Sequence, residues 1–253
     1  MRGQRGRPQE PSWFEQSLAA FQEALGLIDR EREPGVYGVV LHDIGDVHSA
    51  AGDLQQAAAS YRDAVKYKLL ADDPGDLATT LVALGSCLVN ADEPTEARSV
   101  LDQAKEVLSR EAGRIDRRLR AIRLQELGRG YEQLGGRGQP GAYGQALTAY
   151  TAALQLVDAQ ADPAFYGTLL QDIGDVHSAE GRLREAVAAY EKAVERLRGV
   201  ADARGSLPSL LVNLGRVRRR IGALDRPAAA NGEAAPPGTA AEPGEPAGSE
   251  KRE

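Results

Sequence analysis

The chain has 253 residues, a net charge of −6 and one cysteine, Cys87, which excludes an internal disulfide and fits a reducing compartment. It has no run of about 20 apolar residues that could span a membrane, and residues 1–11 lack the apolar core of a secretory signal. We therefore expect a cytoplasmic protein without a membrane segment, and the acidic balance argues against nucleic acid as a partner.

The N-terminal region predicts one helix after a polar leader. Residues 1–11 are rich in Arg, Gly and Pro, which predicts disorder. Ser12 and Glu15 form a capping box, in which two side chains satisfy free amide groups at the start of a helix. Apolar residues then follow at helical spacing: Phe14, Leu18, Phe21, Leu25 and Ile28. We expect a half repeat at residues 12–30 that caps the array described next.

An octapeptide, DIGDVHSA, occurs twice, at residues 43–50 and 172–179. Its glycine recurs through the interval, each time after Ile or Leu. These register glycines are Gly45, Gly85, Gly128, Gly174 and Gly215, at spacings of 40, 43, 46 and 41 residues. Similarity at a nearly constant interval indicates an array of structural repeats.

The first four units share a longer pattern around the register glycine. A bulky residue follows the glycine by three positions, and after a turn come an alanine, an aromatic residue or leucine, and a second alanine. The members are His48, Ala57, Tyr61 and Ala64; Leu88, Ala97, Leu101 and Ala104; Tyr131, Ala146, Tyr150 and Ala153; and His177, Ala186, Tyr190 and Ala193.

This pattern resembles the tetratricopeptide repeat (TPR), a helix–turn–helix unit in which small residues let paired helices approach closely. The units are longer than the usual length of about 34 residues, and in this they are similar to the repeats of kinesin light chain. The resemblance implies an all-α fold, a right-handed superhelical solenoid of antiparallel helix pairs, over residues 12–225.

The pattern predicts four full repeats at about 35–70, 75–110, 115–158 and 163–199, and a partial repeat at 206–225. The expected helix pairs are 35–50 with 54–70, 75–90 with 94–110, 115–134 with 142–158, and 163–179 with 183–199; 206–221 begins a fifth unit. Pro34, Pro74 and Pro163 are placed to begin helices, because proline is tolerated in a first turn.

Two segments interrupt the array. Residues 135–141 hold four glycines and one proline and predict a surface loop rather than helix. After Ile221, residues 222–224 are similar to the turn at 52–54, but Pro227 stands where other units have alanine and predicts that the second helix fails. Residues 226–253 are rich in Pro, Gly, Ala and Glu and predict a disordered tail.

The sequence holds few candidates for catalysis. His48 and His177 each follow an aspartate by two positions, which could indicate acid–base chemistry. Both histidines occupy the position that the repeat fills with tyrosine, so we favour packing over catalysis. Zinc-ligand spacing, a phosphate-binding loop and a nucleophile elbow are absent from the sequence. We expect no enzymatic activity, no metal and no cofactor.

A run of arginines between Arg216 and Arg220 has two interpretations. It could be a basic patch for RNA or an acidic partner. Alternatively, Leu211, Leu214, Val217 and Ile221 form an apolar stripe and the arginines solubilise the other faces of a capping helix. We favour the cap.

The resemblance implies that the first helices of the units line a concave groove that binds extended peptides or helices. It places groove positions two or three residues before each register glycine, one after it, and four or five after it. The candidates are His42, Asp43, Asp46, Ser86, Asn90, Gln125, Glu126, Arg129, Gln171, Asp172, Asp175, Asn213 and Arg216. They vary between units, as expected of a surface that recognises a partner. The Lys and Asn pattern of the chaperone-tail clamp is missing, so we do not expect capture of a C-terminal carboxylate.

These observations predict a non-catalytic adaptor or scaffold that binds a protein or extended peptide, with basic segments of the partner opposite the two octapeptides. The alternative is a regulatory protein whose groove binds a short signalling peptide and controls an effector.

Overall fold

The computed structural model describes residues 12–198, 200 and 206–224, and this part of the chain contains ten helices and no strand. The helices are α1 (Trp13–Leu27), α2 (Pro34–Ala50), α3 (Leu54–Ala71), α4 (Pro74–Asn90), α5 (Pro94–Arg110), α6 (Arg117–Gly136), α7 (Ala142–Leu156), α8 (Pro163–Ala179), α9 (Leu183–Leu197) and α10 (Ser206–Leu224). The expected disordered ends, residues 1–11 and 226–253 with Pro227, lie outside the described residues.

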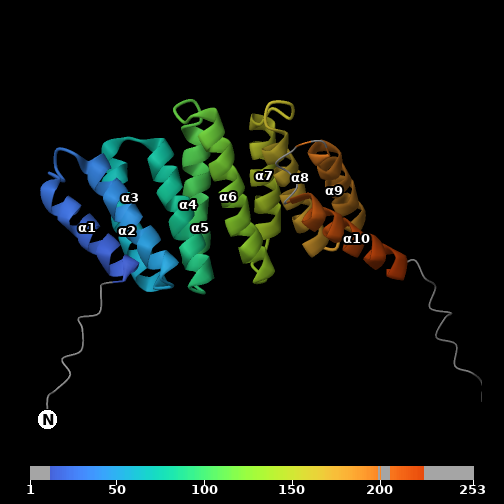
Figure 1. The fold of residues 1–253 in the computed structure, drawn as a ribbon, viewed down its shortest axis with the longest axis horizontal. Helices are drawn as coiled ribbons and strands as arrows, with labels where there is room; N and C mark the ends of the chain where they lie inside the picture. Colours follow the sequence, from blue (N-terminus) through green and yellow to red (C-terminus); the bar gives the residue numbers. More distant parts are fainter. Residues whose placement is uncertain (1–11, 199, 201–205, 225–253) are drawn as a thin grey trace, which may run out of the picture.

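Successive helices pack side by side in one arched array, with α1 at one end and α10 at the other (Figure 1). The most extensive contacts join α2 to α3, α4 to α5, α6 to α7 and α8 to α9. We call α2, α4, α6, α8 and α10 the first helices, and α3, α5, α7 and α9 the second helices. Neighbouring first helices also contact one another. The prediction of an all-α solenoid of helix pairs is confirmed.

Aspartate and proline residues fix where the helices begin. The N-cap side chains of α3, α4, α6 and α8 each accept a hydrogen bond from the first turn: Asp53, Asp73, Asp116 and Asp162. Prolines begin α2, α4, α5 and α8, where the missing N–H costs no hydrogen bond. The predicted capping box of α1 is confirmed, because Ser12 Oγ accepts from the N–H of Glu15 at 3.3 Å and Glu15 Oε2 accepts from the N–H of Ser12 at 2.8 Å.

The register glycines let each first helix approach its second helix. A Cβ added to Gly128 would lie 2.4 Å from Cε1 of Tyr150, and the corresponding distances at Gly45, Gly85 and Gly174 are 2.5–2.6 Å. The side chains that cover these glycines are almost completely buried: Tyr61, Leu101, Tyr150 and Tyr190. The repeated pattern therefore builds a continuous core between the helices.

Helix α6 runs further than the glycines of the 135–141 segment predict. It continues through Gly135 and ends at Gly136. The ring of Tyr143 lies against Gly135, where an added Cβ would be 2.6 Å from Cδ1 of the tyrosine. Glycine is thus required there for close packing between α6 and α7, and packing outweighs its low helix propensity.

Helix α10 differs from its prediction in two ways. Residues 222–224 continue the helix to Leu224 instead of forming a turn. In the first unit the equivalent Gly52 has a φ of +83°, and the turn there leads into the second helix α3. The buried stripe contains Leu210, which is inaccessible, and not Leu211, which is 43% exposed.

Candidate functional site

The groove candidates lie on the first helices, and polar contacts join them from one repeat to the next. Thr80 Oγ1 of α4 lies 3.1 Å from His42 Nδ1 of α2. Gln125 Nε2 of α6 donates to Asp172 of α8 at 2.6 Å. We use the name first-helix face for the surface of α2, α4, α6, α8 and α10 that carries the groove candidates and Thr80.

At the α2 end the first-helix face is acidic. The hydroxyl of Tyr61 donates to Asp46 Oδ1 at 2.6 Å, and His42 Nε2 lies 3.6 Å from Asp46 Oδ2. Burial lowers the pKa of His42, although Asp46 opposes the shift, and burial raises the pKa of Asp43. The Asp46 side chain remains 56% exposed, so this carboxylate is available to a partner.

A buried lysine beneath this region was not identified from the sequence. Lys68 is only 3% exposed, and its Nζ lies 3.8 Å from Asp76 Oδ2. Burial lowers the pKa of Lys68, and Asp76 partly offsets the shift. The sequence does contain a sign of this burial, because Lys68 occupies a position of α3 that holds leucine in α5 and α9. Gly38 lies opposite, and a Cβ added there would be 2.9 Å from Lys68 Cγ.

In the middle of the array two candidates are internal rather than open. Gln125 is 6% exposed and Asp172 is 9% exposed, and they bind each other. Arg129 Nη2 approaches Asp172 Oδ2 at 3.6 Å. Burial raises the pKa of Asp172 to about 6, against the opposing effects of Gln125 and Arg129. These side chains join α6 to α8, and Arg129, which is half exposed, is the member that faces solvent.

The second octapeptide leads to a similar arrangement between α8 and α10. Asp175 Oδ1 accepts from the Tyr190 hydroxyl at 2.6 Å and from Asn213 Nδ2 at 3.2 Å. Burial raises the pKa of Asp175. Beside it lies a hollow of about 420 Å³, which brings three candidates together with two further arginines: Asp175, Asn213, Arg216, Arg219 and Arg220. Arg220 Nη1 donates to the Ser178 carbonyl at 3.2 Å.

The remaining candidates occupy separate places on the same helices. Ser86 and Gln171 are half-buried, whereas Asn90 at the end of α4 is exposed. Glu126 forms an ion pair with Arg123 of its own helix.

The aspartates before His48 and His177 have tyrosine partners. Asp46 binds Tyr61 and Asp175 binds Tyr190. The His48 ring makes an edge contact with Phe14 of α1, with ring centroids 5.5 Å apart. At the equivalent position of α6, the Tyr131 hydroxyl donates to Asp102 of α5 at 2.6 Å. This arrangement favours the interpretation that the histidines fill a packing position.

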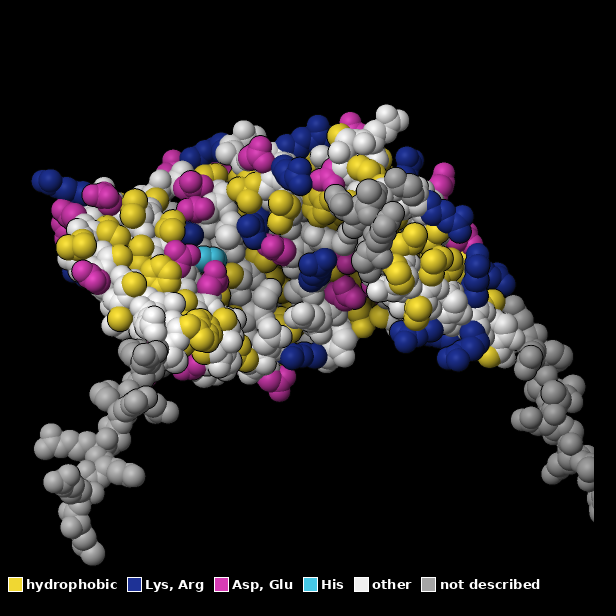
Figure 2. All heavy atoms as spheres, viewed as in Figure 1, with side chains coloured by type: hydrophobic (Ala, Val, Ile, Leu, Met, Phe, Trp, Pro, Cys, Tyr) yellow, Lys and Arg dark blue, Asp and Glu magenta, His cyan; other side chains and the backbone are white. Residues whose placement is uncertain are grey.

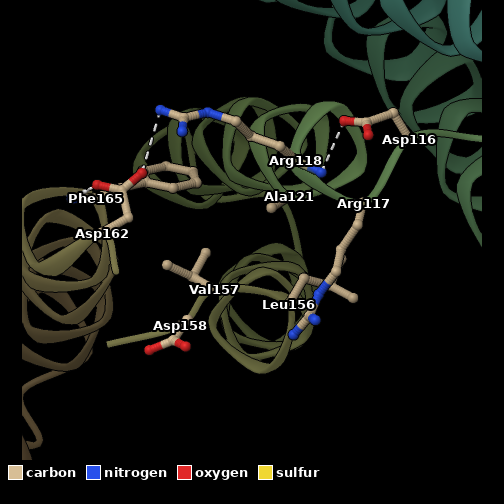
Figure 3. Close-up of a pocket in the computed structure, with 9 residues that line it drawn as sticks. All are labelled: Asp116, Arg117, Arg118, Ala121, Leu156, Val157, Asp158, Asp162 and Phe165. Carbon is tan, nitrogen blue, oxygen red and sulfur yellow. Dashed lines mark hydrogen bonds and ion pairs between the residues drawn. The ribbon is translucent and has the colours of Figure 1, made fainter. Parts of the chain in front are cut away.

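A second hollow, of about 280 Å³, lies between the third and fourth repeats, where α6 and α8 begin and α7 ends (Figure 3). Ala121, Leu156, Val157 and Phe165 give it an apolar lining. Three of its polar groups already have structural partners: Asp162 pairs with Arg118 at 3.2 Å and caps α8, and Asp116 caps α6. None of the groove candidates lines this hollow.

The residues described hold no group of three or more His, Cys, Asp and Glu side chains that could bind a metal ion. None of the helices in residues 12–198 and 206–224 is long and apolar enough to cross a membrane. Cys87 is buried, and its Sγ lies 3.3 Å from the Leu54 carbonyl oxygen.

Comparison with known structures places the fold among kinesin light chain repeats. BtubC (BKLC) from P. vanneervenii is 18% identical, with a TM-score of 0.66 over 92% of this chain and 98% of that one. A putative kinesin light chain from Podospora anserina with nearly identical TPR-like repeats is 17% identical, with a TM-score of 0.59 over 76% of this chain and 89% of that one. At these identities the likeness shows the fold alone, and it confirms the resemblance to long TPR repeats.

No curated protein matches the sequence. The sequence profile of one family does match, over residues 45–215, from the first register glycine to the last. That stretch begins inside α2 of the first repeat and covers the other three repeats completely. The chain therefore belongs to the soluble NSF attachment protein (SNAP) family.

Proposed function

We propose that this protein is a non-catalytic adaptor that binds another protein through an extended segment lying along the first-helix face. The observation that carries the proposal is the hollow between α8 and α10, where Arg216, Arg219 and Arg220 surround about 420 Å³ of open space. The three arginines outnumber the one carboxylate that lines the hollow, Asp175, which already accepts hydrogen bonds from Tyr190 and Asn213, so the hollow suits an acidic group of a partner.

The distribution of charge gives the bound segment a direction. Asp46 is the exposed carboxylate at the α2 end. Asp172 is buried and Asp175 is half-buried, and they accept hydrogen bonds from Gln125 and Tyr190, so these two carboxylates are less accessible to a partner than Asp46. We infer that the partner places a basic side chain opposite α2 and an acidic one at α10. Complementary charge of this kind sets orientation and association rate more than affinity.

Peptides selected from a random library on the immobilised full chain test the proposal. Their dissociation constants are measured for the wild type, Arg216→Gln and Arg218→Gln. Both substitutions remove one charge from the same helix, but Arg218 lies outside the hollow and pairs with Glu191 of α9 at 2.6 Å. Arg216→Gln should weaken binding about two- to fivefold, the range of one exposed charge contact, and Arg218→Gln should leave it unchanged. Equal effects of the two substitutions, or no effect of either, would contradict the proposed site.

A further inference from the structure

The two ends of the array are different halves of a repeat. Phe21 precedes Pro34 by the same interval that separates Tyr61 from Pro74 and Tyr150 from Pro163. Helix α1 therefore stands where a second helix stands in a full repeat. Helix α10 carries the register glycine Gly215 and is a first helix. They lie at opposite ends of the molecule (Figure 1).

Helix α10 leaves open the surface that second helices cover in the complete repeats. A Cβ added to Gly215 meets nothing within 4 Å in the part of the chain described, whereas at Gly174 it meets Tyr190 at 2.5 Å. Leu211, four residues before Gly215, is 43% exposed. At the same position α4, α6 and α8 have leucines that are 3–7% exposed, and Leu41 of α2 is partly buried: Leu81, Leu124 and Leu170 are the three buried ones.

Helix α1 leaves open the complementary surface. None of its residues is buried, whereas α9 has seven buried residues. Phe21 is only partly buried, although the corresponding Tyr190 is 1% exposed. Ala20 is exposed, although the residues at its position in α5, α7 and α9 are buried: Val100, Ala149 and Ala189.

We propose that a second copy of this chain supplies the missing helix. Helix α1 of one copy packs against α10 of the next, with Phe21 over Gly215, and completes a repeat across the interface. The same pairing of first and second helices occurs four times within the chain, so the contact continues an arrangement that the sequence already specifies.

Charge and hydrophobicity agree with this pairing. Helix α1 contains Glu15 and Glu23 and no Lys or Arg, whereas α10 contains Arg216, Arg218, Arg219 and Arg220 and no Asp or Glu. Hydrophobic side chains gather over both ends of the array (Figure 2). Exposed hydrophobic residues of the two end helices are Trp13 of α1, 59% exposed, and Val212 of α10, 51% exposed. Solenoids normally present polar outer faces at their ends.

The contact joins two unlike surfaces, so each copy keeps one end free. Such heterologous interfaces add further copies until a ring closes, unlike a two-fold dimer. We expect a concentration-dependent series of species in sedimentation velocity, which rising salt shifts towards the monomer because the paired ends have opposite charge.

Three substitutions test the interface. Ala20→Arg places a large charged side chain on the α1 surface and should prevent another copy from packing there, and Gly215→Arg should do the same on α10. Gly144→Arg is the control, because Gly144 lies in the middle of the array and an added Cβ there meets nothing within 4 Å. All three positions are exposed, so each variant should show the circular dichroism of the dilute wild type and melt at the same or a slightly higher temperature. Wild type and Gly144→Arg should associate, and Ala20→Arg and Gly215→Arg alone should be monomers.

An equimolar mixture of Ala20→Arg and Gly215→Arg gives the decisive result. Each variant keeps the end that the other lacks, so the mixture should form dimers with one copy of each variant and nothing larger. A wild type that stays monomeric at its highest soluble concentration would overturn the proposal, as would association of either of these two variants alone or a mixture that stays monomeric.

Discussion

A Cβ on Gly174 would lie 2.5 Å from Cε1 of Tyr190, closer than real Cβ atoms approach another atom. The same tyrosine donates a hydrogen bond of 2.6 Å to Asp175, the residue after the glycine. One side chain thus fixes both the spacing of α8 and α9 and the position of a carboxylate on the first-helix face. Tyr61 repeats the arrangement with Gly45 and Asp46.

Gly174→Leu should therefore lower the free energy of unfolding by about 1–3 kcal/mol, the usual cost of overpacking. Gly215→Leu is the matched control, because its added side chain meets no described atom within 4 Å. In a helix interior, glycine costs about 0.5–1 kcal/mol relative to alanine, so the control should be neutral or slightly stabilised. Urea unfolding of dilute samples measures both. Equal midpoints for the two variants would show that Gly174 does not limit the helix contact.

Removing the hydroxyl alone separates packing from hydrogen bonding. Tyr190→Phe leaves the half-buried Asp175 with one fewer donor, which should cost about 1–3 kcal/mol. Tyr61→Phe should cost less, because the Asp46 side chain is 56% exposed and water can replace the hydroxyl. The difference between the two unfolding free energies is the test, and a greater loss for Tyr61→Phe would contradict the argument.

The sequence predicts the repeats well because their positions are local and recur. The register glycines, the tyrosines at intervals and the prolines that begin helices mark the same places in each unit. Contacts between units depend on how neighbouring helices cross, which no spacing along the chain reveals. The bond between Gln125 and Asp172 and the burial of Lys68 are examples. The predicted apolar stripe of α10 is wrong at one position, where Leu210 is buried and Leu211 is exposed. The two leucines are adjacent in the sequence, and only the packing of Leu210 into the core formed with α9 distinguishes them.

Asp172 should make stability depend on pH in an unusual direction for a carboxylate. Its folded pKa of about 6 lies above the ordinary value of 3.8, so the folded state binds this proton more tightly. The contribution is fully present below the ordinary value and is lost as pH rises through the folded pKa. Asp172→Asn should therefore gain stability relative to the wild type, by about 2–3 kcal/mol, between about pH 4 and about pH 7.

Urea unfolding at several pH values measures the gain. Glu106→Gln, at an exposed carboxylate that pairs with Arg110 on the surface of α5, is the control for changing a carboxylate into an amide. A flat difference between Asp172→Asn and the wild type would mean that Asp172 titrates normally in the folded protein.

His177→Tyr tests the packing interpretation of the second octapeptide. The Nδ1 atom of His177 is buried without a hydrogen-bond partner, and burial lowers the pKa of this imidazole. A lowered pKa costs stability as pH falls, because the unfolded state binds the proton more tightly. The variant should match or exceed the wild type in melting temperature, and its advantage should grow from about pH 7 to about pH 5. A variant less stable at every pH would show that tyrosine does not fit this position.

The central claim is that a partner segment lies along the first-helix face. The measurement that tests it most directly uses a fluorophore on one cysteine, with the buried Cys87 replaced by Ala. In one protein the label replaces Asn90 at the exposed end of α4, and in the other it replaces Glu106, which is exposed on the second helix α5. Titration with a library-selected peptide should change the emission at residue 90 with the same dissociation constant as unlabelled protein, and leave residue 106 unaffected. A saturable change at residue 106 without one at residue 90 would place the partner on the second helices and contradict the account.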